Sequence, residues 1–364
     1  MAALTTGLPL PTGAREGLRS APAPAWIQSA PFDLAFFILV PLLTLPLVLG
    51  ALHLHNAFAL VGFVLAFAHY LSSFSFYAWD ENQERHRQRW MAFFGGPVLI
   101  TVVFWVLVTY RVPLVIQFVL FFWNAVHVAR QSCGVLSIYR HRAGVHGTEH
   151  KTSANGAVLA VSLWLCLWNI ETHAEVEPVL RAVSPRLPLV LWAGTGAIAL
   201  GAVGRALAGF RRRAREGCGP RLPELGAFAT GLVLFHPYLW IPDSARATFA
   251  MLLPHYVQYL ALIWLLHRRK FTEPTGSRAQ AWLQRVSARN ALLLPALLTA
   301  GLGFFAAKEL LTRMGHLAFF EACYLLLAFL HFYADGLFWA FRDPHVRRSL
   351  GPYLLRGSPA AAAS

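Results

Sequence analysis

Charged residues are scarce in this sequence. Asp, Glu, Lys and Arg make up 13% of its 364 residues, whereas hydrophobic residues make up 57%. A soluble domain carries about 25% charged residues, so this composition excludes an ordinary soluble protein. It predicts a polytopic membrane protein.

Cysteine sites and short catalytic motifs are missing as well. The four cysteines are scattered and form no CxxC pair, which argues against a disulfide framework or a cysteine zinc site. The sequence has no P-loop, no GxGxxG after a strand, no GxSxG and no HExxH. Its 17 Asp and Glu residues form no dense set of the kind that a cation pump needs.

Long apolar stretches dominate what is present. Ten are long enough to cross a hydrocarbon core of about 30 Å, namely 32–50, 57–79, 91–110, 112–139, 155–170, 187–210, 222–240, 245–267, 290–310 and 317–341. Pro41 and Pro46 are expected to kink the first stretch. The predicted fold class is all-α, an integral membrane bundle of about ten transmembrane helices. Residues 26–351 would form a single domain between flexible tails at 1–25 and 352–364.

The placement of positive charge predicts the orientation of this bundle. The net charge is +14, and most of the 31 Lys and Arg residues fall in alternate loops. The positive-inside rule then places both termini in the cytoplasm. The basic loops are expected to contact anionic lipid headgroups rather than nucleic acid. Because the first apolar stretch begins near Phe32, too late for a cleaved signal peptide, we expect a multi-pass protein of the bacterial inner membrane.

Four histidines interrupt the apolar stretches at about the same depth. In the predicted topology they lie roughly 15–22 Å from the outer boundary, at a rise of about 1.5 Å per residue. They are His69, His127, His255 and His331. An ionisable residue in the bilayer core is costly and indicates a functional site. Four of them at one level predict a shared site, in which neutral imidazoles ligate a metal.

Each histidine also has polar neighbours along its own helix, mostly three or four residues away. They are Ser72 and Ser73 for His69, Asn124, Arg130 and Gln131 for His127, Gln258 and Tyr259 for His255, and Asp335 with Trp339 for His331. Such side chains are suited to orienting the imidazoles, and Asp335 could instead ligate the metal. Arg130 needs a counter-anion, which would be Asp335, Asp80 or the head of an anionic substrate. Asp335, Arg130 and Tyr259 are the candidate catalytic residues.

A dry site at the membrane midplane is suited to oxidation of a hydrophobic substrate. Iron (Fe2+) with several histidines and an open position activates O2, so we predict an iron oxidoreductase that acts on a lipid or isoprenoid. Three alternatives stay open. Two histidines would be axial ligands in a haem-binding redox protein, or His331–Asp335 and His127–Arg130 would form a relay in a proton-coupled transporter. In a structural or assembly protein the four histidines would only pack between helices.

Single transmembrane histidines on separate helices form an arrangement that resembles the bacterial membrane-bound carotene-cleaving dioxygenases. More loosely, the lipid setting is similar to that of the fatty-acid desaturases and hydroxylases. The resemblance is one of architecture, carried by four single residues rather than by an aligned motif. It implies that the ligands of an iron ion are His69, His127, His255 and His331.

Overall fold

The computed structural model describes residues 25–48, 55–145, 148–171, 177–272, 277–289 and 292–355. All regular secondary structure in these ranges is helical, as predicted. The α-helices are α1 (Ala30–Asp33), α2 (Leu45–Val48), α3 (His55–Phe74), α4 (Asp80–Gln88), α5 (Gly96–Thr109), α6 (Pro113–Arg142), α7 (Thr148–Glu171), α8 (Glu177–Val183), α9 (Leu187–Arg215), α10 (Leu222–Val233), α11 (Pro237–Trp240), α12 (Ser244–Lys270), α13 (Arg278–Gln284), α14 (Leu293–Arg313), α15 (Leu317–Phe338) and α16 (Pro344–Leu354). Short 3-10 or π segments are η1 (Leu34–Ile38), η2 (Val40–Thr44), η4 (Ser75–Ala78), η5 (Met91–Gly95) and η6 (Arg285–Arg289).

Six helical segments in the described part of the chain are long and apolar enough to cross a membrane. They are Leu60–Ala78, Met91–Thr109, Leu187–Arg215, Ser244–Lys270, Leu293–Arg313 and Leu317–Phe338. The protein is therefore a helical membrane protein. The other four predicted stretches are helical too, but the count of ten and the cytoplasmic termini stay predictions. Of the predicted tails, residues 1–24 and 356–364 lie outside the described ranges, and α16 continues to Leu354 inside the second tail.

The first apolar stretch is a broken helix, in agreement with its two prolines. It passes from α1 through a π segment and a 3-10 segment into α2, and Pro41 lies in the 3-10 segment. A break frees backbone carbonyls, which neighbouring helices must satisfy because hydrocarbon offers no water. Gln258 of α12 donates to the Phe37 carbonyl at 3.2 Å, and Thr230 of α10 donates to the Ile38 carbonyl at 2.6 Å.

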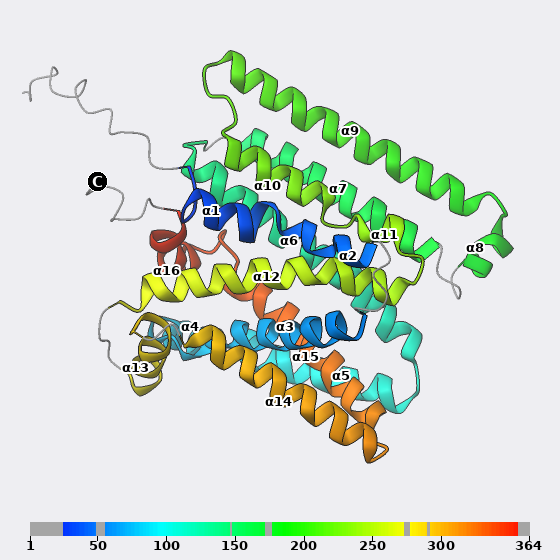
Figure 1. Cartoon of the computed structure of the whole chain (residues 1–364), viewed down its shortest axis with the longest axis vertical. Coiled ribbons are helices and arrows are strands. Elements are labelled where there is room, and N and C mark those ends of the chain that lie inside the picture. The colour runs from blue at the N-terminus through cyan, green and yellow to red at the C-terminus, as the bar shows by residue number, and fades with distance from the viewer. Residues whose placement is uncertain are drawn as a thin grey trace, which may run out of the picture.

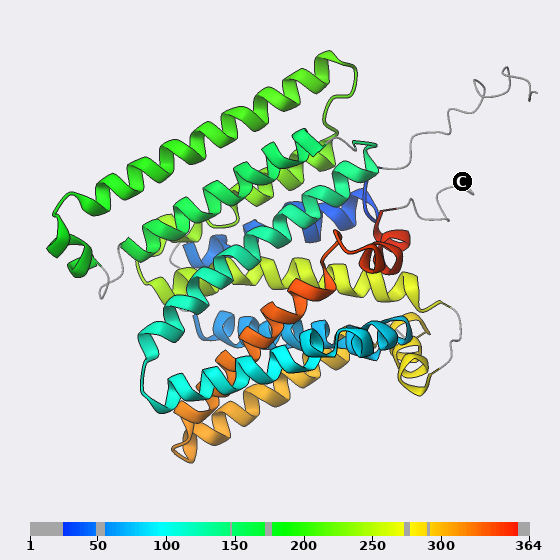
Figure 2. The ribbon, with the colours of Figure 1, turned by 180° about the vertical axis from the view of Figure 1, so that it is seen from behind.

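Helix α12 runs through the middle of the bundle (Figure 1). Asp243 caps its N-terminus by accepting from the backbone N–H of Arg246 at 2.7 Å. Most of its side chains are buried, and it packs against α3, α6, α14 and α16. In the view from behind, α6 and α15 lie nearer to the viewer than α12 (Figure 2). Helix α9 is the outermost element and packs along α7 (Figure 1).

The bundle is apolar outside and holds polar groups inside. Val98 and Leu99 of α5 are 62% and 63% exposed, and Leu200 of α9 is 67% exposed. Such an apolar surface needs hydrocarbon around it. Buried polar side chains gather instead on α3, α6, α12 and α15, which brings imidazole, hydroxyl and carboxyl groups into the interior.

Helix α16 closes one end of the bundle. Asp343 accepts from Arg85 of α4 at 2.8 Å and from Arg89 at 3.2 Å, and it also caps α16 through the backbone N–H of His345. Arg269 at the end of α12 donates to the carbonyl of Tyr353. The arginine-rich end of α12 lies near α13 and α16, and the arginine-rich end of α9 points to the same side of the bundle (Figure 1).

Close helix contact gives a test of this packing. Gly301 of α14 faces α3, and a Cβ there would lie 2.6 Å from the Val64 carbonyl oxygen, whereas a Cβ at Gly303 of the same helix meets nothing within 4 Å. Overpacking typically costs about 1–3 kcal/mol. We expect Gly301→Val to lower the thermal unfolding midpoint in detergent, with Gly303→Val as the matched control. Equal midpoints for the two variants would contradict the α3–α14 contact.

Candidate metal centre

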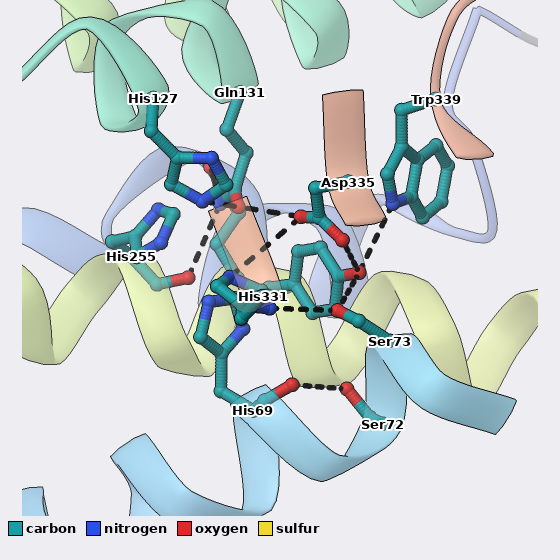
Figure 3. Close-up of polar contacts among 11 residues, drawn as sticks. His69, Ser72, Ser73, His127, Gln131, His255, His331, Asp335 and Trp339 are labelled. Atoms are coloured by element: carbon teal, nitrogen blue, oxygen red, sulfur yellow. Dashed lines mark hydrogen bonds and ion pairs between the residues drawn. The ribbon is translucent and has the colours of Figure 1, made fainter. Parts of the chain in front are cut away.

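The four histidines come together in the interior from four different helices. His69 projects from α3, His127 from α6, His255 from α12 and His331 from α15, and Figure 3 shows their rings clustered. The ring centroid of His69 lies 4.2 Å from that of His331 and 4.8 Å from that of His255. The centroid of His127 lies 5.1 Å from His331 and 5.2 Å from His255. The shared depth inferred from the sequence is thus also a shared location.

Five ring nitrogens at this cluster are buried and have no hydrogen-bond partner within the described residues. They are Nδ1 and Nε2 of His69, Nε2 of His127, Nδ1 of His255 and Nε2 of His331. Three of the rings are fully buried: His69 and His331 are 0% exposed and His255 is 1% exposed. Buried polar atoms are nearly always paired, and leaving one unpaired costs about 1–3 kcal/mol. So many orphan nitrogens at one point indicate a partner that is not a protein side chain.

A histidine triad provides the closest set of candidate ligand atoms. One nitrogen each from His69, His127 and His331 lies within 4.8 Å of the others. Two nitrogens bound to one ion at about 2.1 Å can be no more than about 4.2 Å apart, so an ion would draw these rings inward by tenths of an ångström. His255 lies outside this triad, although its ring contacts those of His69 and His127.

Hydrogen bonds around His331 define its tautomer. Tyr259 donates to Asp335 Oδ1 at 2.7 Å, and its hydroxyl oxygen accepts from Trp339 Nε1 at 3.0 Å. Since that hydroxyl proton is committed, the Ser73 hydroxyl, 2.6 Å away, must donate to Tyr259. Ser73 can then only accept from His331 Nδ1, at 2.9 Å. The proton therefore sits on Nδ1, and the lone pair of His331 Nε2 faces the other histidines (Figure 3).

Asp335 lies between two of the histidines. Its Oδ2 is 3.8 Å from His331 Nε2 and 3.9 Å from His127 Nε2, and the residue is only 6% exposed. Its other oxygen is held by Tyr259. The carboxylate is therefore placed to share an ion with either imidazole.

Several polar residues that helix spacing assigns to a histidine form hydrogen bonds with other groups instead. Ser72 donates to the backbone carbonyl of His69 and not to its ring, while Ser73 bonds to His331 on another helix. Gln131 Nε2 donates to the His255 carbonyl at 3.1 Å and to Gln258 Oε1 at 3.0 Å, so it ties α6 to α12. The i,i+4 rule finds neighbours on one helix, whereas Ser73 and Gln131 form hydrogen bonds with neighbouring helices.

Arg130 pairs with neither carboxylate that the sequence suggested. No ion pair joins it to Asp335, and the carboxylate of Asp80 accepts from the backbone N–H of Ser277 instead. Within the described residues no carboxylate oxygen lies within 4.0 Å of the Arg130 guanidinium. Arg130 is exposed on α6 and borders a cavity.

That cavity has a volume of about 410 Å³ and opens beside the histidines. Its walls come from α6, α12, α15 and the segment after α15, and they are mainly aromatic and aliphatic. His127, Tyr259 and Asp335 lie on its wall, so a molecule in the cavity would touch the cluster. The volume falls in the range of about 300–1,000 Å³ that is usual for small-molecule sites.

Comparison with known proteins adds no assignment. No family model matches this chain, and no curated protein or solved structure matches it either.

The unpaired nitrogens of His69 predict an unusual response to mutation. In chelator-treated, metal-free protein, His69→Leu should raise the free energy of unfolding by about 1–3 kcal/mol, because it removes two unsatisfied polar atoms. The matched control is His267→Leu, since the buried ring of His267 contacts the hydroxyls of Ser75 at 3.1 Å and Ser287 at 3.4 Å. The His267→Leu variant should instead lower the free energy of unfolding. A lower free energy of unfolding for His69→Leu as well would mean that the His69 nitrogens are satisfied.

Proposed function

We propose that this protein is a membrane-embedded oxidoreductase that binds iron at the histidine cluster and oxidises a lipid or isoprenoid substrate. The observation that carries this proposal is the convergence of five buried, unpaired imidazole nitrogens from four helices. The unpaired atoms cost stability in the metal-free chain, and a bound cation would turn that cost into binding energy. Localisation in a bacterial inner membrane, with both termini in the cytoplasm, belongs to the same proposal.

The donor set fits a transition metal. Neutral imidazole binds iron, copper, zinc and nickel, whereas magnesium and calcium prefer oxygen ligands. His69, His127 and His331 would be the first ligands, with His255 or Asp335 completing the set. Iron that keeps an open position would supply the activation of O2 for an oxidation. We favour iron over zinc because the cavity is mainly apolar and Asp335 is the single carboxylate on its wall.

The chain's own residues would bind and orient the substrate and hold its protons. The aromatic and aliphatic cavity walls would exclude water and hold an apolar chain against His127. Ser73 would hold the ring of His331 in the tautomer whose Nε2 is free. Asp335 and Tyr259, joined at 2.7 Å, would accept or return a proton at the Asp335 carboxylate, and Trp339 orients the Tyr259 hydroxyl.

A haem is disfavoured, and a proton-coupled transporter is the second candidate. A haem lies as a flat macrocycle between its axial ligands, but these four rings contact one another around a single point. The transporter hypothesis rests on Asp335. Its Oδ2 lies within 4 Å of imidazole nitrogens on two helices, and the carboxylate could pass a proton between those imidazoles. Metal content separates it from the oxidoreductase.

Metal analysis with an optical spectrum on purified protein tests the proposal. Wild-type protein should carry stoichiometric iron without a Soret band, and His127→Ala/His331→Ala should lose it. The control is His236→Ala/His267→Ala, which removes two histidines whose rings contact hydroxyls outside the cluster and should retain the iron. Wild-type protein that takes up no transition metal under loading conditions would overturn the proposal and leave the transporter as the leading candidate.

The two adjacent serines give a finer test. Ser73→Ala removes the acceptor for His331 Nδ1–H and should weaken metal binding by about 10–100-fold. Ser72→Ala removes a hydroxyl that bonds only to the carbonyl of its own helix turn, so metal affinity should be unchanged. Competition titration against a chelator measures both. Equal affinities for the two variants would show that Ser73 does not position His331.

A further inference from the structure

Arg130 is the one cation on the wall of the cavity beside the histidine cluster. It lies three residues after His127 on α6, a little less than one helical turn and about 4.5 Å along the axis. The cavity wall follows α6 from Trp123 to Ile138, so Arg130 borders its middle part. A guanidinium on the wall of a mainly apolar cavity within a membrane-spanning bundle calls for an anion in that cavity.

No protein group in the described part of the chain supplies that anion. The carboxylate of Asp335 on the opposite wall is directed to Tyr259, His127 and His331. Elsewhere in the bundle, Arg213 forms a bidentate pair with Glu224 at 2.6 and 2.9 Å, and Arg85 pairs with Asp343 at 2.8 Å. Arg130 differs from this pattern and faces an apolar space large enough for a ligand.

We propose that the cavity binds a single-chain fatty acid, whose carboxylate pairs with Arg130 and whose hydrocarbon chain lies along the apolar walls. Arg binds carboxylates through a planar fork of donors, which gives two parallel charge-assisted hydrogen bonds. A volume of about 410 Å³ is near the lower end of the usual range for ligand sites and accommodates one chain rather than a two-chain phospholipid.

This inference narrows the substrate class of the proposed function and rests on it for its chemical consequence. With the carboxylate at Arg130, the carbons nearest to His127 are those next to the carboxyl group. Oxidation would therefore take place close to the acid head and not at the far end of the chain. Binding of the acid itself does not require the metal.

Glycines on the cavity wall help to locate the chain. A Cβ at Gly134 of α6 or at Gly336 of α15 would meet nothing within 4 Å, so both positions border open space. Gly134→Leu should fill part of the cavity and weaken binding of an acid and its neutral ester alike. Arg130→Gln, in contrast, should affect the acid alone.

The experiment is equilibrium binding of radiolabelled palmitate and methyl palmitate to the full chain in nanodiscs of zwitterionic lipid. Arg130→Gln should weaken palmitate binding by about ten-fold to a hundred-fold and change methyl palmitate binding by less than about two-fold. Arg130→Lys should restore part of the loss. Arg205→Gln is the matched control, because Arg205 is an exposed arginine within α9 and does not border the cavity, and it should bind both ligands as wild type does.

Three outcomes would overturn the inference: no palmitate binding by wild-type protein, equal losses for acid and ester in Arg130→Gln, or displacement of palmitate by phosphatidylglycerol at lower concentration than by unlabelled palmitate. Metal content is measured in the same preparations. If the protein carries stoichiometric metal but its palmitate binding does not depend on Arg130, this inference is overturned and the proposed function stays in place. Arg130-dependent palmitate binding without metal keeps the binding site and overturns the oxidoreductase.

Discussion

Polar groups inside an apolar bundle must find their partners within the protein, and the rest of this structure follows from that constraint. Hydrocarbon satisfies no hydrogen bond, so helices associate through packing and through internal polar contacts. The broken first stretch is held by Gln258 and Thr230, which donate hydrogen bonds from two other helices to its freed carbonyls. Gln131 joins the same network through Gln258, and so connects the scaffold to the backbone of His255.

The histidine cluster is the exception to this pairing, and this is what marks it as a site. Ser73, Tyr259, Trp339 and Asp335 form a continuous set of hydrogen bonds on one side of it, yet the nitrogens that face its centre are left unpaired. The fold pairs the carbonyls of the broken helix but leaves these imidazole nitrogens unpaired, so a bound ion would stabilise it. The functional site would then also be the least stable part of the ion-free protein.

Much of the candidate site could be predicted from the sequence. The predictions that were wrong concern contacts between different helices. An isolated histidine in an apolar stretch stands out by its insertion cost, and the structure brings the four predicted histidines together with Asp335 and Tyr259. The pairing of Ser73 was wrong in detail, because spacing along α3 points to His69 whereas the hydroxyl reaches His331 of α15. Of the three counter-anions predicted for Arg130, neither Asp335 nor Asp80 pairs with it, and the head of an anionic substrate at the cavity wall stays a prediction.

The sequence by itself determined that the chain is a helical membrane protein and where each apolar stretch carries a histidine, because hydropathy and helical rise act locally along the chain. It also determined the break in the first stretch, since Pro41 lacks the backbone N–H that a continuous helix needs. Only the tertiary structure decided that α3, α6, α12 and α15 meet, that His69, His127 and His331 form the closest triad, and that a cavity reaches it. Those facts depend on how helices far apart in the chain pack, and nothing in the local pattern encodes which faces meet.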